Sequence, residues 1–269
     1  MPHKSRTETN RERSKKPAAE RSSCTKRTDR VNYRDHSASK GGPRDHMAIT
    51  VETKDCTQLG DAELAEMADL SAEGPAKYEI GVLSKQAEAW VLVSVAREGN
   101  KLRGFSFCTL ERIGGTPCIL IGCATVQRNS KRDTVLKAIM TDQFRRSVLA
   151  FPDEDVVVGT RFVSAAGYEA YKSLQDIVPR PGHRETGEER AWGRRLAKRF
   201  GIESSSYDDR SFIAAGDNSY PLSLDHDALK PEKVDAEVAS QFSKVNAKRG
   251  DSLIAFGWAM AEDLAKLGD

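Results

Sequence analysis

The sequence predicts an α/β (α+β) protein with a mixed, mostly antiparallel sheet and one βαβ crossover. Residues 90–126 contain three β-type runs separated by the turn sequences REGNK and RIGGT, a pattern typical of an antiparallel meander. Helical spacing begins after Asp133, and the apolar run DVVVGTRFV follows that helix. A strand, a helix and a second, doubly buried strand in this order predict a right-handed crossover between parallel strands.

The elements of the core follow in chain order. DAELAEMADL has its apolar residues on one helical face and Asp61 as its cap. The strands of the meander are expected at 90–97, 102–112 and 117–126. The next helix starts at Asp133 and stops at Pro152, and SAAGYEAYKSL, after the apolar run, is a short helix.

Beyond Pro179 we expect a helical C-terminal extension, which divides the chain into 1–46, 47–182 and 183–269. GEERAWGRRLAKRFG is an amphipathic basic helix ended by Gly201. DSLIAFGWAMAEDLAKLG is predicted as a final helix with Asp251 as its cap, and His226 in LDHDAL as a surface histidine. The extension is interpreted either as a subdomain over the acceptor side of a cleft or as a dimerisation element.

The first 46 residues differ in composition from the others. They hold thirteen Lys and Arg against six Asp and Glu, whereas residues 47–269 hold 29 basic and 34 acidic residues. Val31 and Tyr33 are almost their only large apolar side chains, so burial cannot offset the entropy of ordering them. We expect a disordered basic tail: a solvated segment, sequence upstream of a true start at Met47, or an arm that binds nucleic acid through its charge.

The cysteines and the apolar runs limit the class of protein. Five cysteines form an odd set without CxxC pairs or histidines at ligand spacing, so neither a metal site nor a disulfide framework is expected. The longest apolar run, CILIGCATV, is as long as a strand and too short for a membrane span. These features predict a reduced, cytoplasmic protein without a membrane anchor.

Two stretches, 127–132 and 164–174, together with the order of elements, carry a resemblance to a known family. The chain resembles the GNAT superfamily of acyl-CoA-dependent N-acyltransferases over about 61–180. The family turn R/Q-x-x-G-x-G/A falls on 127–132, where Gln127 matches and Ser130 and Arg132 replace the small residues. The family stretch N-x-x-A-x-x-L-Y-x-K-x-G-F is similar to the second stretch, although Gln175 replaces its glycine.

The resemblance implies acetyl-CoA or another acyl-CoA as cofactor. Strands that splay apart before the crossover helix leave backbone groups unpaired, and the extended pantetheine arm can complete them. The diphosphate would lie at the N-terminus of the helix, near the basic turn. The cofactor-binding residues predicted in this way are Ala124, Thr125, Val126, Gln127, Arg128, Ser130, Lys131 and Arg132. The alternative is a solvated basic turn capped by Asp133.

The resemblance also places Tyr171 on the family tyrosine that protonates the leaving coenzyme A thiolate. The alternative for Tyr171 is that its ring packs on a core. Glu111 is our candidate for the general base that removes a proton from the amine. The function implied is transfer of an acyl group from acyl-CoA to an amine of an unknown acceptor.

The rival hypothesis is a non-catalytic binding protein on the same fold, with a degenerate coenzyme A site. It would hold nucleic acid through the N-terminal tail or the basic helix 187–200, or hold a protein partner, and the protein could be a homodimer. A protein without any ligand is a third interpretation.

Overall fold

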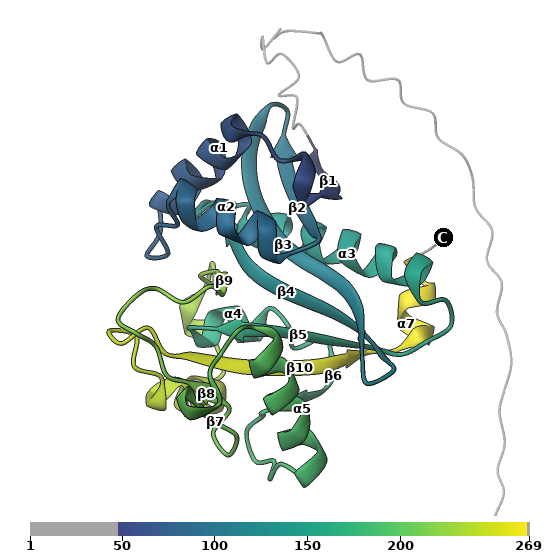
Figure 1. Cartoon of the computed structure of the whole chain (residues 1–269), viewed down its shortest axis with the longest axis vertical. Coiled ribbons are helices and arrows are strands. Elements are labelled where there is room, and N and C mark those ends of the chain that lie inside the picture. Colours follow the sequence, from purple (N-terminus) through teal and green to yellow (C-terminus); the bar gives the residue numbers. More distant parts are fainter. Residues whose placement is uncertain (1–47, 268–269) are drawn as a thin grey trace, which may run out of the picture. The chain divides into compact units, whose positions relative to one another are not determined.

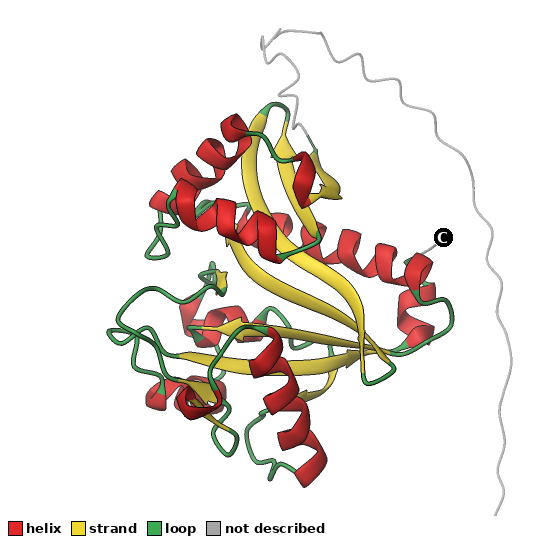
Figure 2. Ribbon diagram, in the orientation of Figure 1, coloured by secondary structure: helices red, strands yellow, loops and turns green. Residues whose placement is uncertain are grey.

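The structure, a computed structural model, describes residues 48–267. The predictions made for the tail 1–46 and for the start at Met47 therefore fall outside the described residues. The strands are β1 (Ile49–Asp55), β2 (Leu92–Glu98), β3 (Lys101–Ile113), β4 (Thr116–Val126), β5 (Val156–Phe162), β6 (Gln175–Val178), β7 (Tyr207–Asp208), β8 (Ile213–Ala214), β9 (Leu224–Asp225) and β10 (Ser252–Ala259). The helices are α1 (Asp61–Ala72), α2 (Ile80–Ala89), α3 (Arg132–Ala150), α4 (Ala165–Glu169), α5 (Gly187–Arg199), α6 (Ala236–Gln241) and α7 (Ala261–Ala265). Figure 1 shows their arrangement, and Figure 2 separates helices from strands.

One mixed sheet contains the strands in the order β1-β2-β3-β4-β9-β5-β10-β8-β7, with β6 paired to β10. The pairs β1–β2, β2–β3 and β3–β4 are antiparallel, as are the pairs of β10 with β5, β6 and β8. The pairs among β4, β5 and β9 are parallel. The predicted fold class, a mostly antiparallel mixed sheet with a βαβ crossover, is confirmed.

The meander and the crossover lie where the sequence predicts them. REGNK and RIGGT turn at Gly99, Gly114 and Gly115, which have φ values of 58°, 61° and 91° and so adopt the left-handed conformation that glycine tolerates. Helix α3 begins one residue before Asp133 and ends two residues before Pro152. Its N-cap is Lys131, so Asp133 lies in the first turn and is not the cap.

The prediction of a final helix is wrong for most of its length. Residues 252–259, expected as part of a final helix, form β10, and only Ala261–Ala265 are helical. Most side chains of β10 are buried because the strand lies inside the sheet, so its apolar run has no polar face to indicate a period. Asp251 therefore precedes a strand and caps no helix. The segment 183–269, expected as an extension, supplies four strands, β7 to β10, to the same sheet.

Among the elements without a predicted counterpart are β1 and α2. β1 is an edge strand with a single buried residue, Thr53, and α2 buries only Leu83 and Gln86. Weak burial gives a weak hydrophobic period, so neither element was predicted. In contrast, the predicted helix at GEERAWGRRLAKRFG is confirmed as α5, with a capping box from Thr186 to Glu189.

Helices cover both faces of the sheet. In Figure 1, α1 and α2 lie on one face of β2–β4 and α3 on the other. Helix α5 lies on the same face as α2, since a Cβ at Gly122 would meet Trp90 just after α2, and one at Gly159 would meet Leu196 of α5. Phe162, at the end of β5, packs on the other face against Tyr168 of α4, 5.7 Å between ring centroids. One face of the sheet is therefore covered by α1, α2 and α5, and the other by α3 and α4.

Candidate functional site

Strands β4 and β5 separate toward their C-terminal ends, as predicted. They pair with each other only over Cys118–Leu120 and Val157–Gly159. Farther along, β9 lies between them, with Ala124 paired to Leu224, Thr125 to Asp225, and Phe162 to Leu224. The backbone N–H of Ala124 donates to the carbonyl of Ser223 at 3.1 Å. The gap that was predicted for a pantetheine arm is thus filled by a segment of the same chain.

The segment before β9 is fastened to the body by Tyr78. The Tyr78 hydroxyl donates to the carbonyl of Pro221 at 3.0 Å and accepts from the N–H of Ser223 at 3.2 Å. Tyr78 is 3% exposed, and Ser223 is fully buried. These buried hydrogen bonds oppose withdrawal of β9, because a buried polar group left without its partner costs about 1–3 kcal/mol.

Four backbone amides at the turn before α3 already have acceptors in the protein. The N–H of Gln127 donates to Arg103 O, and that of Asn129 to Gln127 O, at 2.8 and 2.9 Å. The N–H groups of Lys131 and Arg132 donate to the Asn129 side chain and carbonyl, at 2.8 and 3.2 Å. Four amides that could have approached a diphosphate therefore already have acceptors, and Asn129 takes the role that an anion would have.

The basic side chains of the turn also have partners. Arg128 donates from Nη2 to Asp225 Oδ1 at 2.6 Å and pairs with Asp227 as well. Lys131 pairs with Glu98 of β2, and Arg132 donates to the carbonyl of Asp227 at 3.4 Å.

Asp225 lies within this cluster of charges with its side chain 3% exposed. Burial raises the pKa of Asp225 above its ordinary value, although the neighbouring Arg128 guanidinium opposes the shift. Of the positive charge predicted for a cofactor, that of Arg128 is neutralised by Asp225 and Asp227, and that of Lys131 by Glu98.

A histidine that sequence analysis placed at the surface is buried here. His226 is 6% exposed, and its Nε2 lies 3.1 Å from Asp133 Oδ1. Burial lowers the pKa of His226, and the Asp133 carboxylate opposes this. Its Nδ1 is buried without a hydrogen-bond partner among the described residues. The reason for the misplacement is β9, which holds His226 against the N-terminus of α3.

The two candidate catalytic side chains are not brought together. Tyr171 is 3% exposed, and its ring contacts that of Phe162 with 5.0 Å between centroids. Burial raises the pKa of its phenol. Glu111 lies on β3 opposite Cys118, far along β4 from Ala124, and accepts from Arg199 Nε of α5 at 2.7 Å. Their catalytic roles stay predictions.

Two cavities lie near β9. The larger, about 630 Å³, is lined by α3, α4 and the loop after β9. The smaller, about 160 Å³, lies between Trp90 after α2 and the C-terminal end of α5, over Gly122 of β4 and Arg161 of β5. Leu222 lines the smaller cavity and His226 the larger, so the segment that contains β9 lies between them.

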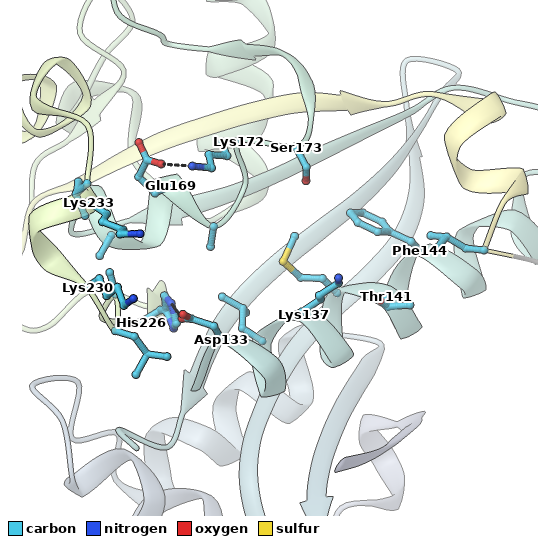
Figure 3. A pocket seen from close by; sticks show the side chains of 18 residues that line it. Asp133, Lys137, Thr141, Phe144, Glu169, Lys172, Ser173, His226, Lys230 and Lys233 are labelled. Atoms are coloured by element: carbon cyan, nitrogen blue, oxygen red, sulfur yellow. Dashed lines mark ion pairs between the residues drawn. The ribbon is translucent and has the colours of Figure 1, made fainter. Parts of the chain in front are cut away.

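The larger cavity combines an apolar lining with a basic rim (Figure 3). Its apolar side chains include Leu136, Met140 and Phe144 of α3, Ala170, and Leu229 and Val234 of the loop. Lys137, Lys172, Lys230 and Lys233 also line it, and all four are exposed. Only Lys172 has an ion-pair partner within the described part of the chain, Glu169 at 3.2 Å. Asp133, which pairs with His226, and Glu169 also line the cavity. It therefore presents apolar surface beside two paired carboxylates and three lysines that make no ion pair within the described residues.

Two kinds of feature, a metal-ligand cluster and a membrane-spanning helix, are not found in residues 48–267. This part of the chain contains no group of three or more His, Cys, Asp or Glu placed to hold a metal ion. It also contains no helix long and apolar enough to cross a membrane.

No family model and no curated protein matches the sequence. Among solved structures, the chain is similar to the ribosomal-protein-S18-alanine N-acetyltransferase from Escherichia coli, at 11% identity and a TM-score of 0.42, over 78% of this chain and 95% of that one. It is also similar to an aminoglycoside 6'-acetyltransferase type Ii, at 12% identity and a TM-score of 0.37, over 48% and 86%. A GNAT family acetyltransferase from Brucella melitensis in complex with acetyl-CoA matches at 15% identity and a TM-score of 0.30, over 42% and 76%. Similarity at this level concerns the arrangement of the chain and not its chemistry.

Coenzyme A does not fit the predicted site, because groups that it would need already have partners within the protein. Its pantetheine arm would need the backbone groups of β4 that β9 uses, and its diphosphate would need amides and cations that Asn129, Asp225 and Asp227 already engage. The stretch YDDRSFIAAGDNSYPLSL, which reaches Leu224 of β9, suggests short strands or loop. The pairing of β9 between β4 and β5 was not predicted, because a strand of two residues has no period. The sequence does contain one indication of this segment, SLDHD, in which two acidic residues, Asp225 and Asp227, follow Leu224.

Proposed function

We propose that this chain is a small-molecule-binding protein on a GNAT-like fold, and that its ligand is an amphipathic organic anion held between α3 and α4. The observation that carries the proposal is β9, which occupies the gap between β4 and β5. With that gap filled, the largest space left for a ligand among the cavities described above is the one of about 630 Å³. Its size falls in the range of small-molecule sites, roughly 300–1,000 Å³.

The lining of the larger cavity supports the ligand class. An apolar body would bury surface against Leu136, Met140 and Phe144, at about 25 cal/mol per Å² removed from water. An anionic head would meet Lys230 and Lys233, whose charges have no acidic partner within the described residues. Nucleic acid is less well supported as a ligand, since two arginines of the basic helix α5 already form ion pairs: Arg194 with Asp209, and Arg199 with Glu111.

A fluorescence titration with anilinonaphthalene sulfonate tests the proposal, because this probe joins an apolar body to an anion. We expect saturable binding that decanoate displaces. The variant Lys230→Glu/Lys233→Glu should weaken probe binding about tenfold or more, since two attractive charges become repulsive. Lys85→Glu/Lys101→Glu makes the same change of charge at exposed positions that do not line the cavity, and should bind as the wild type does. Equal binding by both variants would refute the assignment to this cavity.

The second candidate is the acyl-CoA-dependent N-acyltransferase with Tyr171 and Glu111 as predicted. One observation favours it: β9 is only two residues long and lies between the two cavities, so its withdrawal would reopen the predicted gap. Calorimetric titration with acetyl-CoA separates the candidates. Our proposal predicts that any binding of acetyl-CoA is lost in Lys230→Glu/Lys233→Glu, and micromolar binding that this variant keeps would favour the acyltransferase.

A further inference from the structure

The smaller cavity has a cation in its wall. Arg161 is the only charged residue of β5, and it lines a space of about 160 Å³ together with Trp90, Gly122 and Leu222. Arg161 lies two residues from Gly159, whose missing side chain would meet Leu196 of α5. Since alternate residues of a strand share a face, Arg161 points to the face that α5 and α2 cover, away from α3 and the larger cavity.

The guanidinium of Arg161 has no carboxylate partner in the described part of the chain. Its Nε donates to Ser252 Oγ of β10 at 3.0 Å, and its two terminal nitrogens make no hydrogen bond within residues 48–267. Arg103 and Arg128, which are also partly buried, each pair with a carboxylate at 2.6 Å. Burial lowers the pKa of Arg161 to about 10. Arg161 is partly buried, and the Asp217 carboxylate acts on its charge from a distance without forming an ion pair with it. Its terminal nitrogens therefore remain donors that an anion can engage.

The other walls of the cavity are apolar or already paired. The indole of Trp90 lies against Gly122, where a Cβ would come within 2.5 Å of the ring, and its Nε1 donates to Gln86 at 2.9 Å. Arg199 stacks over Trp90 at 5.1 Å from the ring centroid, and its charge is engaged by Glu111. Arg161 is therefore the cation of this cavity that makes no ion pair within the described residues, and it lies next to an aromatic wall.

We propose that the smaller cavity binds a small organic carboxylate, with the carboxylate on the terminal nitrogens of Arg161 and the apolar part of the molecule against Trp90. The planar fork of an arginine matches the two oxygens of a carboxylate, and such paired hydrogen bonds are stronger than neutral ones. A space of this size holds several water molecules and hence one organic acid with few heavy atoms. The inference does not depend on the larger cavity or on acyl transfer, because it uses different residues on the other face of the sheet.

Thermal unfolding of the full chain with acetate, propanoate and benzoate, at constant ionic strength, tests this site. We expect a saturable rise in melting temperature with at least one of these acids and none with propanamide or benzamide, which have the same shape without the charge. The variant Arg161→Met should raise the apparent Kd by roughly 10-fold to 100-fold, the range expected for a charge-assisted pair. Arg161→Lys, which keeps the charge but not the fork, should lie between Arg161→Met and the wild type.

The matched control is Arg145→Met, since Arg145 is exposed on α3 and lines neither cavity. It should respond to the acids as the wild type does. Chloride and sulfate are the comparison ions. An equal rise with sulfate would overturn the carboxylate assignment, and no rise with any acid would overturn the site. An undiminished rise in a folded Arg161→Met protein, checked by circular dichroism, would place the binding elsewhere and overturn it too.

Discussion

Replacing Arg128 by methionine tests whether β9 is held in the gap by its charges. The substitution leaves the Asp225 carboxylate, 3% exposed, without its main partner. Breaking a buried ion pair from one side costs about 3–5 kcal/mol. The Arg128 side chain is 24% exposed, and the Tyr220 hydroxyl remains 3.5 Å from Asp225, so we expect a loss of about 2–3 kcal/mol. In a domain of this size that corresponds to a fall in Tm of about 5–10 °C.

Urea unfolding measures this loss, and hydrogen exchange locates it. The Ala124 amide, which donates to Ser223, should exchange faster in Arg128→Met than amides of the meander, because β9 opens before the sheet does. The double variant Arg128→Met/Asp225→Asn should recover part of the loss, since it leaves no unpaired charge.

Arg112→Met is the control for this experiment. Arg112 pairs with Glu154 at 2.6 Å, but the two side chains are 45% and 39% exposed, and an exposed pair contributes about 0–1 kcal/mol. Equal stability of the two single variants, together with unchanged exchange at Ala124, would refute the view that buried charge fastens β9.

Three other substitutions have expected outcomes. Gly122→Ala should destabilise the fold by about 1–3 kcal/mol in urea unfolding, because its Cβ would lie within 3 Å of Trp90; an unchanged stability would contradict the packing. Tyr171→Phe should change stability by less than about 1 kcal/mol, since the ring contact with Phe162 is kept; a loss of several kcal/mol would show an essential hydroxyl. Hydrogen bonds, first of all from the Arg249 side chain, hold the pKa of Asp251 at about 2, below its unfolded value of about 4. The stability that Asp251 contributes is therefore present above pH 4 and lost as pH falls through 2. The melting temperature of the wild type should exceed that of Asp251→Asn at pH 4, and the difference should shrink as the pH is lowered to 2.

The meander, the crossover and α5 could be predicted because each has its own period or turn chemistry. REGNK and RIGGT require left-handed glycine, and α3 has a continuous apolar stripe of Val135, Leu136, Ile139 and Met140. β10 could not be predicted in the same way. Its residues are buried on both faces, and LIAFGWA fits a buried helix as well as a buried strand. The segment is a strand because it pairs with β5. Such pairing between distant segments cannot be recognised in a single sequence.

The candidate site shows the same limit. The gap between β4 and β5 and the position of the basic turn were predicted from the order of elements. The partner of Arg128 was not, since Asp225 is 97 residues away and only the pairing of β9 brings it there. Arg161 had a signal in the sequence: a lone arginine in the apolar run DVVVGTRFV, which was interpreted as a strand buried on both faces. A cation in such a strand must be paired, neutralised or left for a ligand.

The two arginines near β9 explain why the cavities on the two faces differ. Arg128 and Arg161 each lie at the C-terminal end of a strand that borders β9, but the acidic side chains Asp225 and Asp227 both serve Arg128. On the other face, the residue of the same segment that lines the cavity with Arg161 is Leu222, which carries no charge. One segment of the chain thus covers the predicted diphosphate position with its own carboxylates and gives no ion pair to Arg161 in the opposite cavity. An added anion gains little beside Arg128, where it would compete with a covalently linked carboxylate, and gains most beside Arg161, where none has to be displaced.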